Sequence, residues 1–196
     1  VADNIYGSMA VSMDDVGIAV GEVNTRFQLT GDKLQSLSEQ FLQFAQINET
    51  DLNSSIDSTD AIMNKFQIDA SRTSDVLGLF TKVGQDTGIS METLFNSLQT
   101  NGASLQELGF DLTQSTMLLA QMEASGVDTA TGVTSLKKAV TNLTDSGEPL
   151  NTALSEVITS IKDAKSDTEA LNIASSTFGS KGAAEMSKAI RDGRLD

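Results

Sequence analysis

The sequence predicts an all-α fold, a compact bundle or array of about eight to ten short helices joined by tight glycine-containing turns. Apolar residues recur at helical spacing, and no segment of four or more residues shows the period-two alternation of a strand. A triplet of glycine, an apolar residue and Ser or Asp occurs at 88–90, 109–111 and 126–128. Glycine accepts the left-handed conformation past a helix end, and Ser or Asp caps the next helix. Each triplet therefore predicts a junction between two helices.

The region before the first triplet predicts four helices, preceded by a weakly patterned segment at residues 1–11. Ser12, followed by Asp14 and Asp15, is typical of a helix start, because acidic side chains there interact favourably with the helix dipole. The expected helices run from Ser12 to a break at residues 29–31, on to about Asn48, from Thr50 or Asp51 to about Phe66, and over roughly residues 70–86.

The region of the triplets predicts shorter helices. A helix capped by Ser90 is expected to stop at Asn101-Gly102 and to be followed by a single turn over residues 104–108. Asp111 and Asp128 are expected to cap the next two helices. The almost continuous apolar run at residues 117–120 predicts the buried centre of a bundle.

The C-terminal region begins at the clearest predicted boundary, residues 146–149, where Pro149 fits the first position of a helix. Residues 166–169 form a capping box for a helix with Leu171 and Phe178 inward, ended by Gly179. A last helix is expected over about residues 181–192, with Ala184 on its apolar face. The expected organisation is an N-terminal segment (1–11), a helical core (12–145) and C-terminal helices (146–196) packed on the same domain.

Composition limits the possible chemistry. The 196 residues include no Cys and no His, which excludes disulfides, thiolate chemistry and His-dependent zinc or nucleophilic sites. The net charge is −14, and no Lys or Arg occurs from Val83 to Leu136, so direct nucleic-acid binding is not expected. No apolar run is long enough to span a bilayer. The chain begins with Val and ends in a charged segment, and we expect it to be a piece of a longer protein.

Each candidate functional site is better explained by a structural role, such as a helix cap, a helix end or core packing, than by binding or catalysis. The acidic pairs at Asp14-Asp15 and at Asp57 and Asp60, and the stretch 48–60, lack the glycine and glutamate spacing of a calcium loop. Residues 84–88 lack the lysine of a phosphate loop. The methionines are expected in the core: Met117, Met122 and Met186. The basic residues are expected on solvated helix surfaces: Lys137, Lys138 and those from Lys162 to Arg194. We therefore predict no catalytic, cofactor-binding or metal-binding residue and no cofactor.

Several motifs, in this order, resemble the core region of phage tail tape measure proteins. They are residues 87–94 (TGISMETL), 105–111 (LQELGFD), 120–127 (AQMEASGV), 178–182 (FGSKG) and 189–196 (AIRDGRLD). Residues 25–45 are similar to the helices that precede them in that family. The resemblance covers roughly residues 12–196 and implies a structural role.

The resemblance implies that the chain lies in the lumen of a virion tail, where the tape measure sets tail length and aids assembly and DNA delivery. Its implied partners are the tail tube protein, tail assembly chaperones and other copies of itself, and assembly would take place in the host bacterial cytoplasm. The alternative is a helical secreted surface or flagellin-like filament protein, which would show long uninterrupted heptads. A helical enzyme or lysin module is a third hypothesis; we expect no enzymatic activity.

Overall fold

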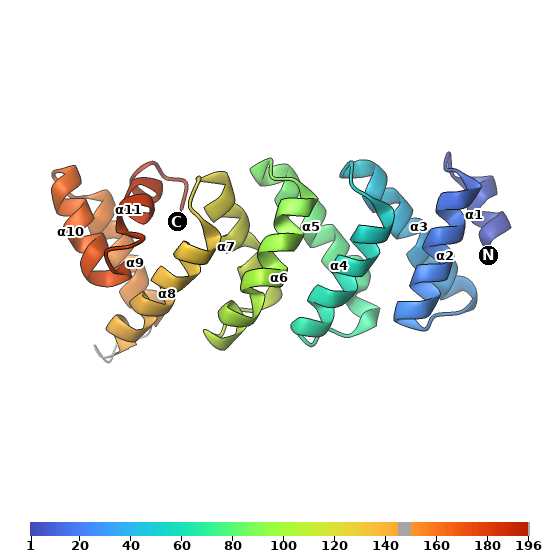
Figure 1. Ribbon diagram of the computed structural model, residues 1–196, viewed down its shortest axis with the longest axis horizontal. Coiled ribbons are helices and arrows are strands. Elements are labelled where there is room, and N and C mark those ends of the chain that lie inside the picture. Colours follow the sequence, from blue (N-terminus) through green and yellow to red (C-terminus); the bar gives the residue numbers. More distant parts are fainter. Residues whose placement is uncertain (145–149, 196) are drawn as a thin grey trace. The chain divides into compact units, whose positions relative to one another are not determined.

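The computed structural model describes residues 1–144 and 150–195. Within them the chain forms eleven α-helices and one short 3₁₀ helix, and no strand (Figure 1). The all-α prediction of short helices is confirmed, with slightly more helices than expected. The elements are α1 (Ala2–Ser8), α2 (Met13–Phe27), α3 (Gly31–Ile47), α4 (Leu52–Lys65), η1 (Ala70–Arg72), α5 (Thr73–Thr87), α6 (Met91–Glu107), α7 (Leu112–Ala124), α8 (Thr129–Thr144), α9 (Leu150–Lys162), α10 (Asp167–Phe178) and α11 (Ala183–Arg191).

The main difference from the expected elements is α6, which is one continuous helix where the sequence predicted a stop at Asn101-Gly102. Gly102 has no positive φ, and a Cβ at this position would lie 2.9 Å from a ring carbon of Phe66. The Lys65 Nζ also donates to the Gln99 carbonyl. The glycine therefore makes room for the Phe66 ring, at the end of α4, against α6 instead of ending the helix. The prediction of a separate turn at residues 104–108 is wrong.

The chain divides into two compact units, residues 1–102 and 103–196. The predicted boundary at residues 145/146 falls on residues outside the described part of the chain. In the first unit the helices stack in two layers, because α2 packs on α4 and α3 packs on α5 (Figure 1). Side-chain bonds join α3 to α5, with the Ser74 hydroxyl donating to Gln40 at 2.5 Å and the Asn48 amide donating to Thr81 at 3.0 Å.

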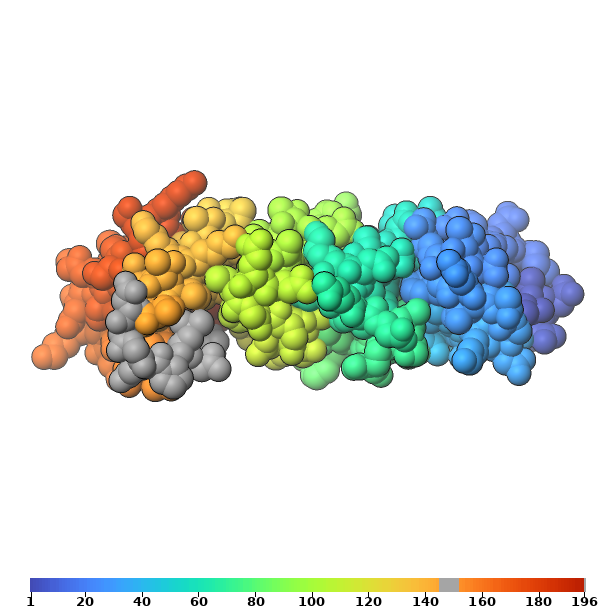
Figure 2. All heavy atoms as spheres, turned by 90° about the horizontal axis from the view of Figure 1, so that it is seen from below, coloured from blue at the N-terminus to red at the C-terminus, as the bar shows by residue number. Residues whose placement is uncertain are grey.

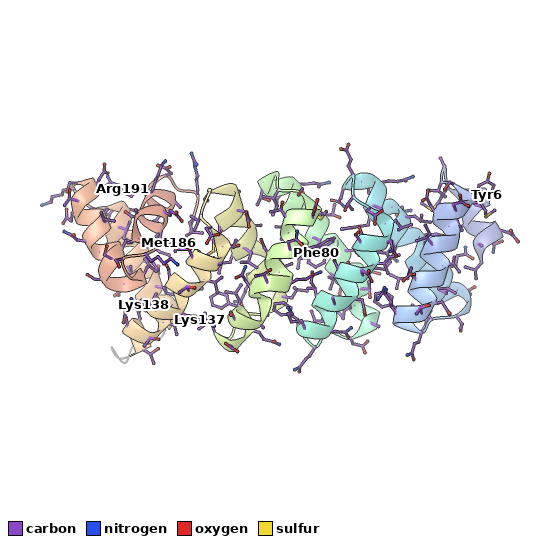
Figure 3. The ribbon with its side chains drawn as sticks, viewed as in Figure 1. Tyr6, Phe80, Lys137, Lys138, Met186 and Arg191 are labelled. Carbon is purple, nitrogen blue, oxygen red and sulfur yellow. The ribbon has the colours of Figure 1, made fainter. Side chains whose placement is uncertain are left out.

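Aromatic side chains hold the centre of the first unit. The Phe80 and Phe95 rings meet edge to face with centroids 5.4 Å apart, and Phe44 stacks on Phe95 at 6.2 Å. Phe27 and Phe41 form a second pair at 5.8 Å. Phe80 is fully buried, as the stick view illustrates (Figure 3). On the face seen in Figure 2, side chains fill much of the space that the ribbons leave between neighbouring helices of this unit.

The core of the second unit depends on small residues. In this unit α10 packs on α8, α9 and α11. Alanine at 170, 174, 183 and 189 lets these helices approach closely around Phe178. The buried members of this core are Met122, Val127, Ala139, Ile161, Ala170, Ala174, Phe178, Ala183, Met186, Ala189, Ile190 and Leu195.

Three residues that were expected to face inward are exposed. Met117 is 49% and Leu171 40% exposed, and Ala184 also faces solvent. Successive helical residues turn by about 100°, so the run 117–120 cannot place all its members against one neighbour. In α10 the buried face passes through Ala170 and Ala174, which leaves Leu171 beside it. The expectation of an all-round buried helix at residues 117–120 is therefore wrong.

Candidate functional site: the helix junctions

The candidate sites considered from sequence are structural in the folded chain. Gly88 ends α5 with φ of 74° and donates its N–H to the Gly84 carbonyl at 2.8 Å, so residues 84–88 form a helix end. Asp51 caps α4 within the stretch 48–60. Asp14 and Asp15 lie in the first turn of α2, and Asp57 pairs with Arg26. Among the described residues, no group of three or more acidic side chains is placed to hold a metal ion.

The three predicted glycine triplets form the junctions expected of them. Their glycines have φ of 74° (Gly88), 89° (Gly109) and 73° (Gly126). The third residue of each triplet accepts from a backbone N–H in the next helix. These caps are Ser90 to Thr93 at 3.1 Å, Asp111 to Gln114 at 2.8 Å and Asp128 to Thr131 at 2.8 Å. At Asp111 the Gln114 side chain accepts in return from the Asp111 N–H, which completes a capping box.

The middle residue of a triplet also has a defined role. Phe110 and Val127 donate their N–H groups to carbonyls five residues earlier, those of Leu105 at 3.0 Å and Met122 at 2.9 Å. This is the hydrogen bond of a Schellman motif, which satisfies a carbonyl at the helix end. The Val127 side chain is 2% exposed. Each triplet therefore ends one helix and starts the next, and at residues 126–128 its apolar residue also anchors the turn in the core.

Three further junctions are similar, but their left-handed residue is not glycine; Asp51 and Asp69 cap the following helices, whereas the Thr30 side chain makes no capping hydrogen bond. The residues with positive φ are Gln28 (53°), Glu49 (50°) and Gln67 (56°), and they precede Leu29-Thr30, Thr50-Asp51 and Ile68-Asp69. Thr50 and Ile68 donate to the carbonyls five residues earlier at 3.0 and 2.8 Å. Sequence reasoning missed these left-handed positions because Gln and Glu are unusual there. The one feature of the sequence that could have indicated the left-handed conformation is that each of these residues lies two positions before a helix cap.

The six junctions recur regularly along the chain. Their left-handed residues stand at 28, 49, 67, 88, 109 and 126. One α-helix and one turn fill each interval, with the short η1 added before α5, so the described region from α2 to α8 repeats a helix-plus-junction unit. Repeated units of this kind stack on their neighbours, which agrees with the layered packing of α2 on α4 and of α3 on α5.

Three capping aspartates have lowered pKa values. The backbone N–H of Ser54 lowers the pKa of Asp51, the Ser71 hydroxyl lowers the pKa of Asp69, and the Thr131 hydroxyl lowers the pKa of Asp128. In each case the hydrogen bond stabilises the ionised carboxylate. These shifts have a structural cause, helix capping, and do not mark a reactive group.

The motif at residues 178–182 docks the end of α10 on α8. Phe178 enters the core, and Gly179 has φ of 78° with the Lys138 stem lying against it (Figure 3). A Cβ at Gly182 would overlap the Ser135 hydroxyl. The Asn142 amide donates to the carbonyls of residues 176 and 177 at 3.1 and 2.9 Å. The contact with α8 therefore requires Gly182, whereas Gly179 is favoured by its positive φ.

The basic residues of the second unit are mostly paired or packed. Lys137 lies 3.3 Å from Glu107, and Arg191 lies 2.9 Å from Asp167. At the end of α11, the Arg194 N–H donates to Ala189, and the Arg194 carbonyl accepts from the Ser125 hydroxyl at 3.1 Å. Leu195 is then buried at 4% exposure. Residues 189–195 thus fold back onto the end of α7.

No helix in the described part of the chain has the length and apolar character needed to cross a membrane. A model of the family described as phage-related minor tail protein matches residues 4–192. No curated protein and no solved structure matches the chain.

Proposed function

Because the chain belongs to the phage-related minor tail protein family, we propose that it is a segment of a tail tape measure protein, which sets tail length and aids assembly and DNA delivery. Membership of the family makes it a phage tail protein. The finer assignment is supported by the order of the junction and glycine motifs between residues 87 and 195, which resembles the core region of tape measure proteins.

The observation that carries the proposal is the repeated helix-plus-junction unit. A protein that measures length needs a chain whose contribution to length rises with its number of residues. Similar three-residue junctions recur between residues 28 and 126, so the chain can be extended by one helix and one junction at a time. The filament alternative predicts long heptads, whereas the described helices contain 7 to 17 residues.

The proposed location is the lumen of the virion tail, with assembly in the host bacterial cytoplasm. The proposed partners are the tail tube protein, tail assembly chaperones and other copies of the chain. The acidic surface, with net charge −14, favours a role beside DNA delivery without direct binding to DNA. We assign no catalytic activity to this segment, and its carboxylates have the structural roles of caps and ion pairs described above.

The test is tail length in the parent phage. Deleting residues 30–68 joins Leu29 to Asp69, so that Gln28-Leu29-Asp69 keeps the left-handed, apolar and capping positions of a junction. Electron microscopy should show shorter tails: by about 10 Å where the deleted helices stack side by side, and by about 60 Å where they extend along the tail at about 1.5 Å per residue. Deleting residues 12–196 should shorten tails further or abort them.

A control variant separates chain length from folding. Phe80→Ala removes a buried ring at constant chain length and should leave the length of completed tails unchanged. Tails of normal length after the 30–68 deletion would contradict the proposed function.

A further inference from the structure

A groove runs along the surface of the first unit between α3 and α5. Two hollows of about 540 and 430 Å³ lie end to end in it and share Gln40 and Ser74. Residues near the starts of both helices line the first hollow, and residues near their ends line the second, so the helices run parallel. Along α3 the groove extends from Asp32 to Ile47, which is about 22 Å at 1.5 Å per residue.

The groove carries no net charge in a strongly acidic unit. Residues 1–102 contain 14 acidic and 5 basic residues. The charged side chains that line the groove are Asp32, Asp69, Lys33 and Lys82, two of each sign. Between them lie neutral residues such as Ser36, Gln43 and Thr81, with Ile47 61% exposed at one end. A partner can contact this surface without desolvating an excess of carboxylates.

Gly78 lines the groove, and no neighbouring atom of the chain explains why this position is a glycine. Three glycines inside helices make room for a neighbour: Met91 lies where a Cβ of Gly84 would be, Phe66 beside Gly102 and Met122 beside Gly132. At Gly78 nothing lies within 4 Å of that position. An exposed glycine inside a helix costs about 0.5–1 kcal/mol relative to alanine, so the groove keeps an open space at the expense of helix stability.

The exposed face of α2 has matching properties. Gly17 and Gly21 lie inside this helix with nothing within 4 Å of a built Cβ, and Met13 and Ile18 are 45% and 42% exposed beside them. Only Asp14 is charged among the exposed residues that share this side of the helix: Met13, Asp14, Gly17, Ile18, Gly21, Asn24, Thr25 and Gln28. The helix has 15 residues and is about 22 Å long, close to the length of the groove.

We propose that the groove between α3 and α5 receives the exposed face of α2 from a second copy of the chain. The two surfaces agree in length. The groove has no net charge, and the α2 face carries one charge, that of Asp14. Lys33 and Lys82, toward opposite ends of the groove, can pair with that carboxylate. Each copy carries −14 charges, so copies repel one another, and these neutral faces allow contact with the least repulsion. Gly17, Gly21 and Gly78 then let the backbones of the helices approach closely.

The contact joins two different surfaces and therefore leaves one of each free. Within the first unit α2 lies in one layer and α3 and α5 in the other (Figure 1). A heterologous contact of this kind adds copies one after another instead of closing a symmetric dimer. The proposal rests on the proposed function for its setting, in which other copies of the chain are among the proposed partners.

The experiment is sedimentation equilibrium of the purified 196-residue chain at micromolar to millimolar concentrations. The wild-type mass should rise with concentration past that of a dimer. Gly78→Gln fills the groove and Gly21→Gln covers the face of α2; both replace an exposed helical glycine, so the fold should become more stable. Each variant alone should associate at least tenfold more weakly. Ile47→Asp provides a second groove variant at an exposed site.

Mixing the two glutamine variants gives the decisive result. Gly78→Gln keeps an intact α2 face and Gly21→Gln keeps an intact groove, so an equal mixture should form one-to-one dimers and nothing larger. Gly7→Gln, at an exposed glycine of α1 outside both surfaces, is the matched control and should associate as wild type does.

A wild-type chain that stays monomeric at every concentration would overturn the proposal, as would a mixture that fails to dimerise. Wild-type association that Gly78→Gln and Ile47→Asp leave unchanged would place the contact elsewhere and also overturn it. If the chain is monomeric while deletion of residues 30–68 still shortens tails, the groove proposal fails and the proposed function stands.

Discussion

Replacing Gln67 by glycine is expected to stabilise the first unit, although it removes a side chain. Gln67 is exposed and holds φ of 56° between α4 and η1. The left-handed conformation costs a residue with a Cβ about 1–2 kcal/mol, and glycine avoids this cost. The greater freedom of glycine in the unfolded chain offsets about 0.4–1 kcal/mol of the gain. The expected net stabilisation is about 0.5–1 kcal/mol.

The opposite change in the second unit should have the opposite sign. At Gly109 φ is 89°, and a built Cβ meets nothing within 4 Å, so Gly109→Ala changes only the backbone preference. The same two effects predict a loss of about 0.5–1 kcal/mol. The pair of variants therefore tests one physical cause at two equivalent positions of the repeat.

The assay is urea unfolding followed by far-UV circular dichroism, supported by thermal melts. The midpoint should rise for Gln67→Gly and fall for Gly109→Ala while the slope m stays constant. For a unit of about 100 residues, 1 kcal/mol corresponds to a shift of about 4–8 °C in Tm. A loss of about 1 kcal/mol for Gln67→Gly, as expected for glycine inside a helix, would refute the reasoning.

Two further predictions concern contacts that the structure defines. Gly182→Ala should destabilise the second unit by about 1–3 kcal/mol, because the new Cβ overlaps the Ser135 hydroxyl, and a urea-unfolding double-mutant cycle with Ser135→Ala should recover part of the loss. Additive losses would show that the overlap is relieved in another way. Acid should destabilise the first unit, because Asp51 has a lowered pKa in the folded state. The contribution of the ionised Asp51 to the stability of the fold is present above about pH 4 and is lost as the pH falls through that lowered pKa. Asp51→Asn keeps a cap that does not titrate, so thermal melts should show a smaller decrease in Tm between pH 5 and pH 3 than wild type; an unchanged decrease would count against the role of Asp51.

The helix starts were predictable because capping is a local interaction. Ser12, Ser90, Asp111, Asp128 and Ser166 all accept from a backbone N–H three residues later, as their sequence contexts indicate. The same local logic identified the glycine junctions. No long-range contact is needed to favour these conformations.

The remaining junctions could not be read from residue type alone. Gln28, Glu49 and Gln67 are held at positive φ by the helices on either side, which outweigh their own conformational preference. Their regular spacing is visible in the sequence only once the backbone conformation is known. For the same reason the repeated unit was missed, although three of its six junctions were identified.

Gly88, which ends a helix, and Gly102, which lies inside one, show most clearly what the sequence alone cannot predict. Gly88 and Gly102 both follow an amphipathic helical segment, and the sequence predicts a stop at each. Gly88 does end a helix with φ of 74°, whereas Gly102 continues one because the Phe66 ring occupies the space of its Cβ. Which role a glycine has depends on a side chain from another helix.

By itself the sequence determined that this chain is helical, where most of its helices begin, and that it lacks the residues for His- or Cys-based chemistry. These properties follow from local hydrogen bonding, side-chain periodicity and composition. Only the tertiary structure decided that α6 is continuous, that Gln and Glu take left-handed positions, and that α3 and α5 leave a groove with an open space at Gly78. Those features depend on contacts between residues distant in sequence, whose energies exceed the local preferences that a sequence displays.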